Sequence, residues 1–274
     1  MEIKSAEIIL FSPTGGTRKV ISSFVRGMKL DNFQIVNLAE GLKPFKLSIT
    51  SDIVIIGLPV YGKRIPQFLY PFLTNIDGNN KPVVLITLYG NISPGWAIDE
   101  LYAITRKINL KVVAWGRFIG EHSFSTPILP VAEGRPNEDD LDEAQKFGKL
   151  TREKLMAADT IENVELKLLK PIIVGYIISL INKIVPQKSG NVFTKLPSVN
   201  MKLCQNCGIC VRSCPKQAID SNDLHIQRDL CIRCFSCVKK CPSKAREIKY
   251  KKKILVTWFF NRWGNNLKKP EYFL

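Results

Sequence analysis

Every cysteine of the 274-residue chain lies in one stretch, from Leu203 to Pro242. The pattern CxxCxxCxxxCP occurs twice in this stretch, and the two copies are offset by 27 residues. The same offset relates Leu203 to Leu230 and Ala218 to Ala245, so the two halves are copies of one unit. Thiolates that recur at such short intervals are suited to bind metal. The sequence therefore predicts a ligand cage in this stretch.

The spacing of the cysteines fits an iron–sulfur cluster. Three thiolates separated by two residues each can wrap one face of a cubic [4Fe–4S] cluster, while backbone N–H groups of the loop point at its sulfurs. The fourth cysteine lies too far along the chain to close the same cage easily.

Disulfide bonds are one alternative to a cluster, but they belong to oxidising compartments, and no signal peptide begins at Met1. A zinc ribbon is another, but it needs neither the third cysteine nor the proline after the fourth.

The cysteine run resembles that of bacterial ferredoxins with two clusters, in which the fourth cysteine of each copy binds the other cluster. The resemblance implies one cluster bound by Cys204, Cys207, Cys210 and Cys241. It implies a second cluster bound by Cys231, Cys234, Cys237 and Cys214. The second copy has Phe235 and Ser236 where the first has Gly208 and Ile209. We expect this difference to change the hydrogen bonding and solvent access of one cluster, and hence its reduction potential.

A second candidate site lies near the start of the chain. The apolar run from Ala6 to Phe11 predicts a buried parallel strand, and a helical pattern covers residues 18–28. The loop between them consists of Ser12, Pro13, Thr14, Gly15, Gly16 and Thr17. The N–H groups of a helix N-terminus, flexible glycines and hydroxyl donors together favour a bound phosphate. The loop is neither a Walker P-loop nor a GxGxxG turn, and a generic strand-to-helix turn capped by Thr17 is the alternative.

Four more apolar runs predict the rest of a parallel sheet, at residues 33–37, 52–60, 81–88 and 110–118. The runs at 52–60 and 81–88 each lead into a loop that opens with tyrosine and glycine. In an open α/β sheet, ligands bind beyond the carboxyl ends of the strands, where these loops would lie. The sequence thus predicts a doubly wound α/β domain with five parallel strands in the order 2-1-3-4-5, closed by a helix over residues 137–157.

The small-residue loop matches the SxTGxT phosphate loop of flavodoxins, and the segments PVYG and YGN resemble those that contact the flavin in that family. The resemblance implies FMN rather than FAD, with its phosphate bound by Ser12, Thr14, Gly15, Gly16 and Thr17. It implies contacts to the flavin ring from Pro59, Val60, Tyr61, Gly62, Tyr89, Gly90, Asn91 and Trp96. Tyr61 is the candidate for stacking on the ring. His122 lies near the same edge, where a lone histidine is more often structural than ligand-binding.

The chain carries a formal net charge of +16, and most of it lies in the second half. Residues 158–274 contain 21 Lys and Arg against 8 Asp and Glu, a net charge of +13. Two oxidised clusters and a flavin phosphate would reduce the charge of the loaded protein to roughly +10. We expect such a surface to attract an acidic redox partner protein, and peripheral contact with an anionic membrane is an alternative.

Two segments outside these sites carry less information. Residues 172–185, in the connector 158–200, are apolar with a narrow polar stripe, and they fall short of the roughly 20 residues that span a bilayer. They predict a helix packed between two domains or, alternatively, lying on a membrane surface. The tail, 251–274, combines lysines with aromatic side chains. We expect the tail to pack on the rest of the protein and not to bind nucleic acid, because no nucleic-acid module accompanies it.

As a whole, the chain resembles the flavodoxin–ferredoxin fusion family, found mainly in anaerobes. The expected parts are a flavodoxin-like FMN domain (1–157), the connector (158–200), a small α+β ferredoxin domain (201–250) and the tail (251–274). The resemblance implies an electron-transfer protein that passes electrons between two [4Fe–4S] clusters, FMN and an external partner. The alternatives are a flavin-dependent reductase of a small molecule and an iron–sulfur sensor. No catalytic acid, base or nucleophile is evident, and the lack of a targeting signal predicts a cytoplasmic protein.

Overall fold

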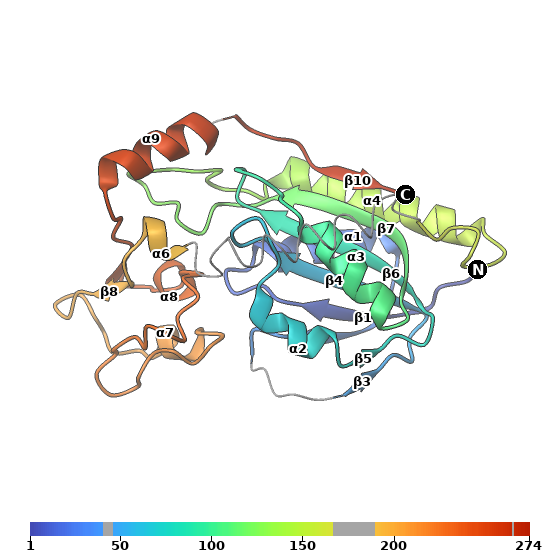
Figure 1. Ribbon diagram of the computed structural model, residues 1–274, viewed down its shortest axis with the longest axis horizontal. Coiled ribbons are helices and arrows are strands. Elements are labelled where there is room, and N and C mark those ends of the chain that lie inside the picture. The colour runs from blue at the N-terminus through green and yellow to red at the C-terminus, as the bar shows by residue number, and fades with distance from the viewer. Residues whose placement is uncertain (41–45, 167–189, 265) are drawn as a thin grey trace.

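The computed structural model describes residues 1–40, 46–166, 190–264 and 266–274. Figure 1 shows a larger part built around a β-sheet and a smaller part, carrying the cysteines, beyond the carboxyl ends of its parallel strands. The apolar segment 172–185, for which a helix was predicted, lies outside the described residues. Within these ranges, no helix combines the length and the apolar character needed to cross a membrane.

Five strands of the large sheet run parallel, in the order β2-β1-β4-β6-β7. They are β1 (Ser5–Leu10), β2 (Asn32–Asn37), β4 (Ile53–Pro59), β6 (Pro82–Tyr89) and β7 (Lys111–Ile119). Every residue of β4 and β6 is buried, as expected for central strands covered on both faces. In chain order this is the predicted order 2-1-3-4-5, which confirms the doubly wound, flavodoxin-like topology.

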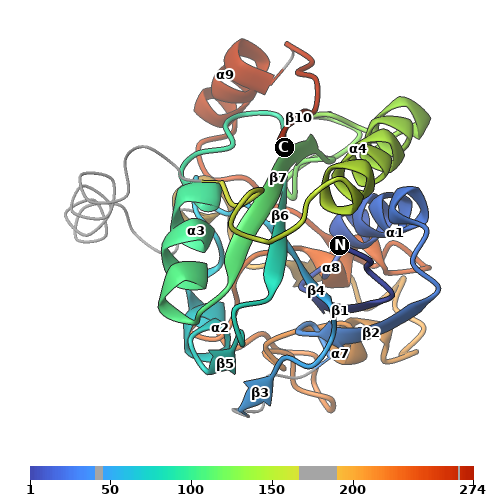
Figure 2. The same ribbon diagram turned by 90° about the vertical axis from the view of Figure 1, so that its right-hand side faces the viewer.

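Helices cover both faces of this sheet (Figure 2). The helices α1 (Gly16–Met28) and α4 (Glu138–Met156) lie on one face. The other face carries α3 (Ala97–Lys107), with the short η1 (Gln67–Leu69) and α2 (Tyr70–Leu73) nearby. The helix that was predicted to close the first domain is α4, and Asn137 caps it through a reciprocal capping box.

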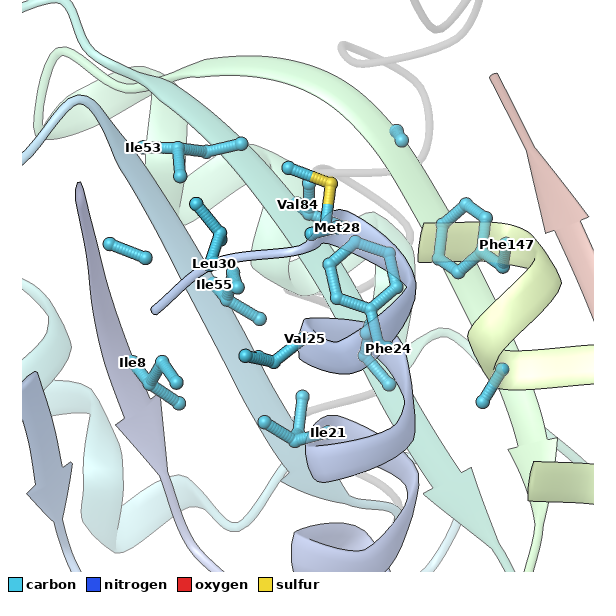
Figure 3. Packing of buried hydrophobic residues seen from close by; sticks show 14 of the residues in the cluster. Ile8, Ile21, Phe24, Val25, Met28, Leu30, Ile53, Ile55, Val84 and Phe147 are labelled. Carbon is cyan, nitrogen blue, oxygen red and sulfur yellow. The ribbon is translucent and has the colours of Figure 1, made fainter. Parts of the chain in front are cut away.

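Helices α1 and α4 pack very closely. A Cβ added at Gly27 would lie 1.9 Å from the carbonyl oxygen of Gln145, and one at Gly148 would lie 2.1 Å from that of Phe24. Only glycine lets the two backbones approach to this distance. Next to this contact, the rings of Phe24 and Phe147 pack with centroids 4.9 Å apart (Figure 3). The packing fixes α1, whose N-terminus follows the predicted phosphate loop, on the sheet.

The C-terminal residues add a sixth strand to the predicted five. Strand β10 (Glu271–Phe273) pairs antiparallel with β7 at the edge of the sheet. The preceding helix α9 (Lys253–Gly264) buries Val256 and Phe260 in a small core with Leu129. The tail therefore packs on the rest of the protein, as expected, and it completes the large sheet.

The cysteine part is small and has few regular elements. They are α6 (Gly190–Phe193), β8 (Ser198–Val199), α7 (Ile209–Arg212), α8 (Ser236–Lys239) and β9 (Arg246–Glu247), with β8 and β9 paired antiparallel. Its core joins Ala218, Ile219 and Ile226 to Cys237.

In the large part, β3 (Leu47–Ser48) and β5 (Ile76–Asp77) form a further parallel pair.

Candidate functional site

The two cysteine copies fold into the same loop. Three residues of each copy have a left-handed backbone, and they recur at the 27-residue offset. The pairs are Asn206 and Arg233 (φ 52° and 54°), Gly208 and Phe235 (68° and 56°), and Gln217 and Lys244 (49° and 52°). A short helix follows the second pair in each copy, α7 in the first and α8 in the second. The repeat of sequence is therefore also a repeat of structure.

Backbone N–H groups donate to the fourth cysteine of both copies. The N–H of Ala218 donates to Cys214 Sγ at 3.2 Å, and that of Ala245 donates to Cys241. Burial acts to raise the pKa of the Cys241 thiol, but the hydrogen bonds outweigh it and the pKa is lowered. A lowered pKa favours the thiolate, which is the form that binds metal.

Four cysteines line one cavity: Cys214, Cys231, Cys234 and Cys237, here called the inner cage. The three thiols from the second copy each interact electrostatically with Cys214 of the first. Burial raises the pKa of these three thiols, that of Cys237 to about 12, because the cage is shielded from water. The structure thus places three cysteines of the second copy and the fourth cysteine of the first around one cavity.

Two buried arginines beside the inner cage have N–H groups without a partner among the described residues. Arg233 is 7% exposed and donates from Nε to the Lys195 carbonyl at 3.4 Å. Arg246 is 3% exposed and donates from Nη2 to the Leu224 carbonyl at 2.9 Å. Nη1 of Arg233 and both Nε and Nη1 of Arg246 make no hydrogen bond. Unpaired buried cationic donors are costly, so their place next to four thiols fits an anionic group such as a [4Fe–4S] cluster.

The remaining cysteines are called the outer cysteines: Cys204, Cys207, Cys210 and Cys241. None of them is buried, whereas Cys234 and Cys237 of the inner cage are. Cys207 is exposed, and Arg212 at the end of α7 donates to its carbonyl oxygen at 3.1 Å. All eight cysteines are free thiols. Across the described ranges, no three His, Cys, Asp or Glu side chains converge as ligands of a single ion would. The thiolates around a four-iron cluster lie further apart than that.

The predicted phosphate loop joins β1 to the N-terminus of α1. Ser12 Oγ accepts a hydrogen bond from the N–H of Arg18 at 3.0 Å, which folds the loop over the first helical turn. Gly15, with φ 94°, is the N-cap residue, and a Cβ there would meet open space. Thr14 is exposed and Thr17 is buried. Since the first turn has no acidic residue and Gly15 offers no side-chain cap, the positive end of the helix dipole fits an anion such as a phosphate.

The loops that follow β4 and β6 lie beside the phosphate loop. A Cβ on Gly16 would lie 2.8 Å from the side chain of Leu88, near the end of β6. The N–H of Val60 donates to the Leu88 carbonyl at 2.8 Å and joins the β4 loop to β6. Pro59 is buried at the end of β4, and Gly62 turns the loop with φ 58°. The structure therefore brings the predicted phosphate and ring loops together at the carboxyl edge of the sheet.

The aromatic candidates have different surroundings. The Tyr61 hydroxyl is hydrogen-bonded to the Ser123 side chain and interacts electrostatically with Cys234. Burial and the charge of Cys234 raise the pKa of Tyr61 well above its ordinary value. Tyr89 is buried, and burial raises its pKa to about 12. Trp96 is half-buried and forms the N-cap of α3. Tyr61 is thus the predicted ring contact that also neighbours the inner cage.

The side chain of Asn91 is occupied by the C-terminal segment. Its Nδ2 donates to the carbonyl oxygens of Gly264 at 2.7 Å and Asn266 at 3.0 Å. Its Oδ1 accepts from the N–H of Lys268 at 3.1 Å. Only the backbone of Asn91 therefore has the freedom to contact a flavin.

His122 is half-buried, lies close to Gly90 and packs among aromatic side chains. A Cβ on Gly90 would lie 2.4 Å from the His122 ring. The Nδ1 atom accepts the N–H of Phe124 at 3.1 Å, and the ring packs edge-on against Phe124 and Phe260 at 4.9 Å. Burial, with the nearby charge of Lys239, lowers the pKa of His122 to about 4. These contacts agree with the structural role expected of a lone histidine.

The second cysteine copy, together with Lys216 of the first, contacts the large part of the chain. The Ser236 hydroxyl donates to the carbonyl oxygen of Pro13, in the phosphate loop, at 2.6 Å, and both residues are buried. Phe235 packs edge-on against Phe124 with centroids 5.5 Å apart. The contact is completed by an ion pair between Lys239 and Glu121 and by Lys216, 4.9 Å from the ring of Phe68. None of these contacts was predicted, because each joins residues that are far apart in sequence.

A surface groove of about 470 Å³ lies away from these sites, between α1 and β2. Apolar side chains of the sheet edge, such as Phe33 and Ile35, line it together with basic residues such as Arg26. It contains none of the residues predicted to bind FMN or a cluster.

A family model described as a 4Fe–4S dicluster domain matches residues 196–242. No curated protein matches the chain in sequence. The chain is similar to a solved flavodoxin from the domain Archaea, with 16% identity over 56% of this chain and 99% of that chain (TM-score 0.39). It is also similar to Fusobacterium nucleatum flavodoxin bound to flavin mononucleotide, with 20% identity over 56% and 98% (TM-score 0.39). The strand order itself and the dicluster match indicate a flavodoxin-like domain joined to an iron–sulfur domain.

Proposed function

We propose that the chain passes electrons between two [4Fe–4S] clusters and an FMN bound at the carboxyl edge of the large sheet. The dicluster match, the inner cage and the phosphate loop at the N-terminus of α1 support this proposal. A cluster exchanges one electron at a time, whereas a flavin holds one or two. The combination therefore connects one-electron carriers with a two-electron centre, and such a transfer requires no catalytic acid, base or nucleophile.

A separate set of residues would bind each of the two clusters and the FMN. The inner cage would bind one cluster, and the outer cysteines would bind the other. The loop from Ser12 to Thr17 would bind the FMN phosphate through backbone N–H groups and hydroxyls. Tyr61, with the backbone of the loops after β4 and β6, would contact the ring.

The observation that carries the proposal is the contact between the inner cage and the phosphate loop. Ser236, two residues after Cys234, donates to the Pro13 carbonyl at 2.6 Å. Cys234 itself interacts electrostatically with Tyr61. A cluster in the inner cage would therefore lie against the flavin site. Since electron transfer slows steeply with distance, this proximity supports an intramolecular electron path.

The external partner is proposed to be an acidic one-electron carrier protein. Residues 158–274 carry 21 basic against 8 acidic side chains, and the outer cysteines lie near the surface of that half. Complementary charge accelerates the encounter of two proteins and orients them.

Anaerobic purification tests the proposal. Iron, sulfide and flavin are quantified in the purified protein, which is then reduced stepwise. We expect about eight irons and one FMN per chain, all reducible. Two matched variants, Cys207→Ala for the outer set and Cys234→Ala for the inner cage, should each lose about four irons while the other cluster stays. Zinc in place of iron would contradict the cluster assignment, and absence of FMN after reconstitution would contradict the flavin assignment.

A further inference from the structure

The two cysteine sets differ in buried positive charge. Arg233 and Arg246 lie beside the inner cage, and both interact electrostatically with Cys231. Arg246 also interacts with Cys237. Both guanidinium groups keep N–H groups without a hydrogen-bond partner in the described part of the chain. Arginine stays protonated throughout the working pH range, so the inner cage has two permanent cations in a medium that screens them weakly.

The first copy carries no equivalent charges. At the 27-residue offset, the counterpart of Arg233 is Asn206, and that of Arg246 is Ile219. Arg212 contacts the first loop, but it is exposed to solvent, which screens its charge. Its counterpart in the second copy, Lys239, is paired with Glu121. The backbone N–H of Arg246 donates to Cys241 of the outer cysteines, whereas the guanidinium groups of Arg233 and Arg246 interact with thiols of the inner cage.

We propose that Arg233 and Arg246 raise the reduction potential of the cluster in the inner cage, so that it exceeds that of the cluster on the outer cysteines. The inference rests on the proposed function. Reduction adds one negative charge to a cluster, and a nearby buried cation stabilises the more negative state. No bond would be made or broken, and the electron gained by the cluster in the inner cage would be the one lost by the cluster on the outer cysteines.

The order of the two reduction potentials determines which cluster holds an electron. Of the two clusters, the one next to Tyr61 and the phosphate loop would be reduced first. An electron received from a one-electron carrier at the outer cysteines would then move downhill toward the flavin site. The second copy thus supplies both the contact with the large part of the chain and the charge that favours the electron there.

Redox titration of the anaerobic protein, followed by electron paramagnetic resonance, tests this inference. The variants are Arg233→Asn and Arg246→Met, and Arg212→Gln is the control on the outer set. Arg233→Asn installs the residue that the first copy has at the same left-handed position, so the loop should keep its fold. Cys234→Ser identifies which signal belongs to the inner cage, because it changes a ligand there. We expect each inner variant to make reduction of that cluster roughly tenfold less favourable, about 59 mV.

The remaining outcomes discriminate between explanations. If the charge is the cause, Arg246→Lys should restore most of the reduction potential that the inner cluster loses in Arg246→Met. If the shape of the guanidinium is the cause, it should not. Arg212→Gln should leave the inner signal in place. The inference fails if the inner cluster has the lower potential, or if its potential is unchanged in both arginine variants. If the protein without substitutions contained no clusters or no FMN, that result would instead contradict the proposed function.

Discussion

A single hydroxyl group joins the two parts of the chain at the proposed flavin site. Ser236 donates to the buried carbonyl of Pro13, and Ser236→Ala would leave that acceptor without its donor. Such a loss costs about 1 kcal/mol or more. Because Pro13 belongs to the phosphate loop, we expect FMN affinity, measured by fluorescence quenching, to fall roughly fivefold or more.

A matched control for this variant lies at the end of the first helix of the repeat. The Ser213 hydroxyl donates to the Cys210 carbonyl at 3.4 Å, within its own copy of the repeat. Ser213→Ala should leave FMN affinity unchanged. Equal losses in both variants would contradict the role assigned to Ser236.

The imidazole of His122 makes stability depend on pH. Its folded-state pKa of about 4 lies below the ordinary 6.5, so unfolding takes up a proton as the pH falls below 6.5. Stability is therefore complete above that value and declines as the pH falls toward 4. Between pH 7.5 and 5.5 we expect urea unfolding to show a loss of about 1 kcal/mol from this group.

Variants of the two histidines check the origin of this loss. In His122→Asn the amide oxygen can replace Nδ1 as an acceptor but does not titrate, so the loss should disappear. The other histidine, His225, is exposed, and His225→Gln should keep the full pH dependence. A loss that persists in His122→Asn would assign the effect to another group.

At the scale of elements, the C-terminal strand depends on one loop residue. Asn91 makes three hydrogen bonds, to Gly264, Asn266 and Lys268, which precede β10 in the chain. Asn91→Gly removes these bonds but tolerates the positive φ of 61°. We expect a loss of about 2 kcal/mol in the free energy of unfolding and faster hydrogen exchange in residues 268–274. Asn109→Gly, at an exposed position with φ 57°, is the control and should leave that exchange unchanged.

The central strands could be predicted from sequence because burial on both faces requires continuous apolar runs, as in β4 and β6. Strand β10 could not be predicted in this way. It has three residues, two of them exposed, and its pairing is provided by the edge of β7. Tyrosine and phenylalanine are common in strands, but three residues are too few to show an alternating pattern.

The same limit applies to the candidate site. The spacing of the repeat indicated a cluster site, and the resemblance to bacterial ferredoxins implied that Cys214 belongs with the second copy, whose cysteines line the same cavity. The contact of Ser236 with Pro13 and the side-chain role of Asn91 depend on residues more than 170 positions away. Such pairings are set by tertiary packing, and only a structure reveals them.

At the scale of the whole molecule, the uneven charge predicts how the protein meets its partner. With a net charge of +13 on residues 158–274, electron exchange with an acidic carrier protein should slow as salt is added. Stopped-flow rates at ionic strengths from about 0.01 to 0.3 M measure this effect. The internal exchange between clusters and flavin serves as the control and should not depend on salt. A partner rate that is insensitive to salt would argue against electrostatic docking.

The cysteine part is attached to the large sheet at both of its ends, because the chain after it forms β10 on the edge of that sheet. Before that part, the N–H of Leu166 donates to the Val112 carbonyl on β7 at 2.7 Å, and after it β10 pairs with the same strand. A part tethered at one end samples a volume set by its linker, whereas one anchored at both ends to a single strand has far fewer arrangements. The inner cage is therefore presented to the phosphate loop at a high effective concentration that dilution of the protein does not change.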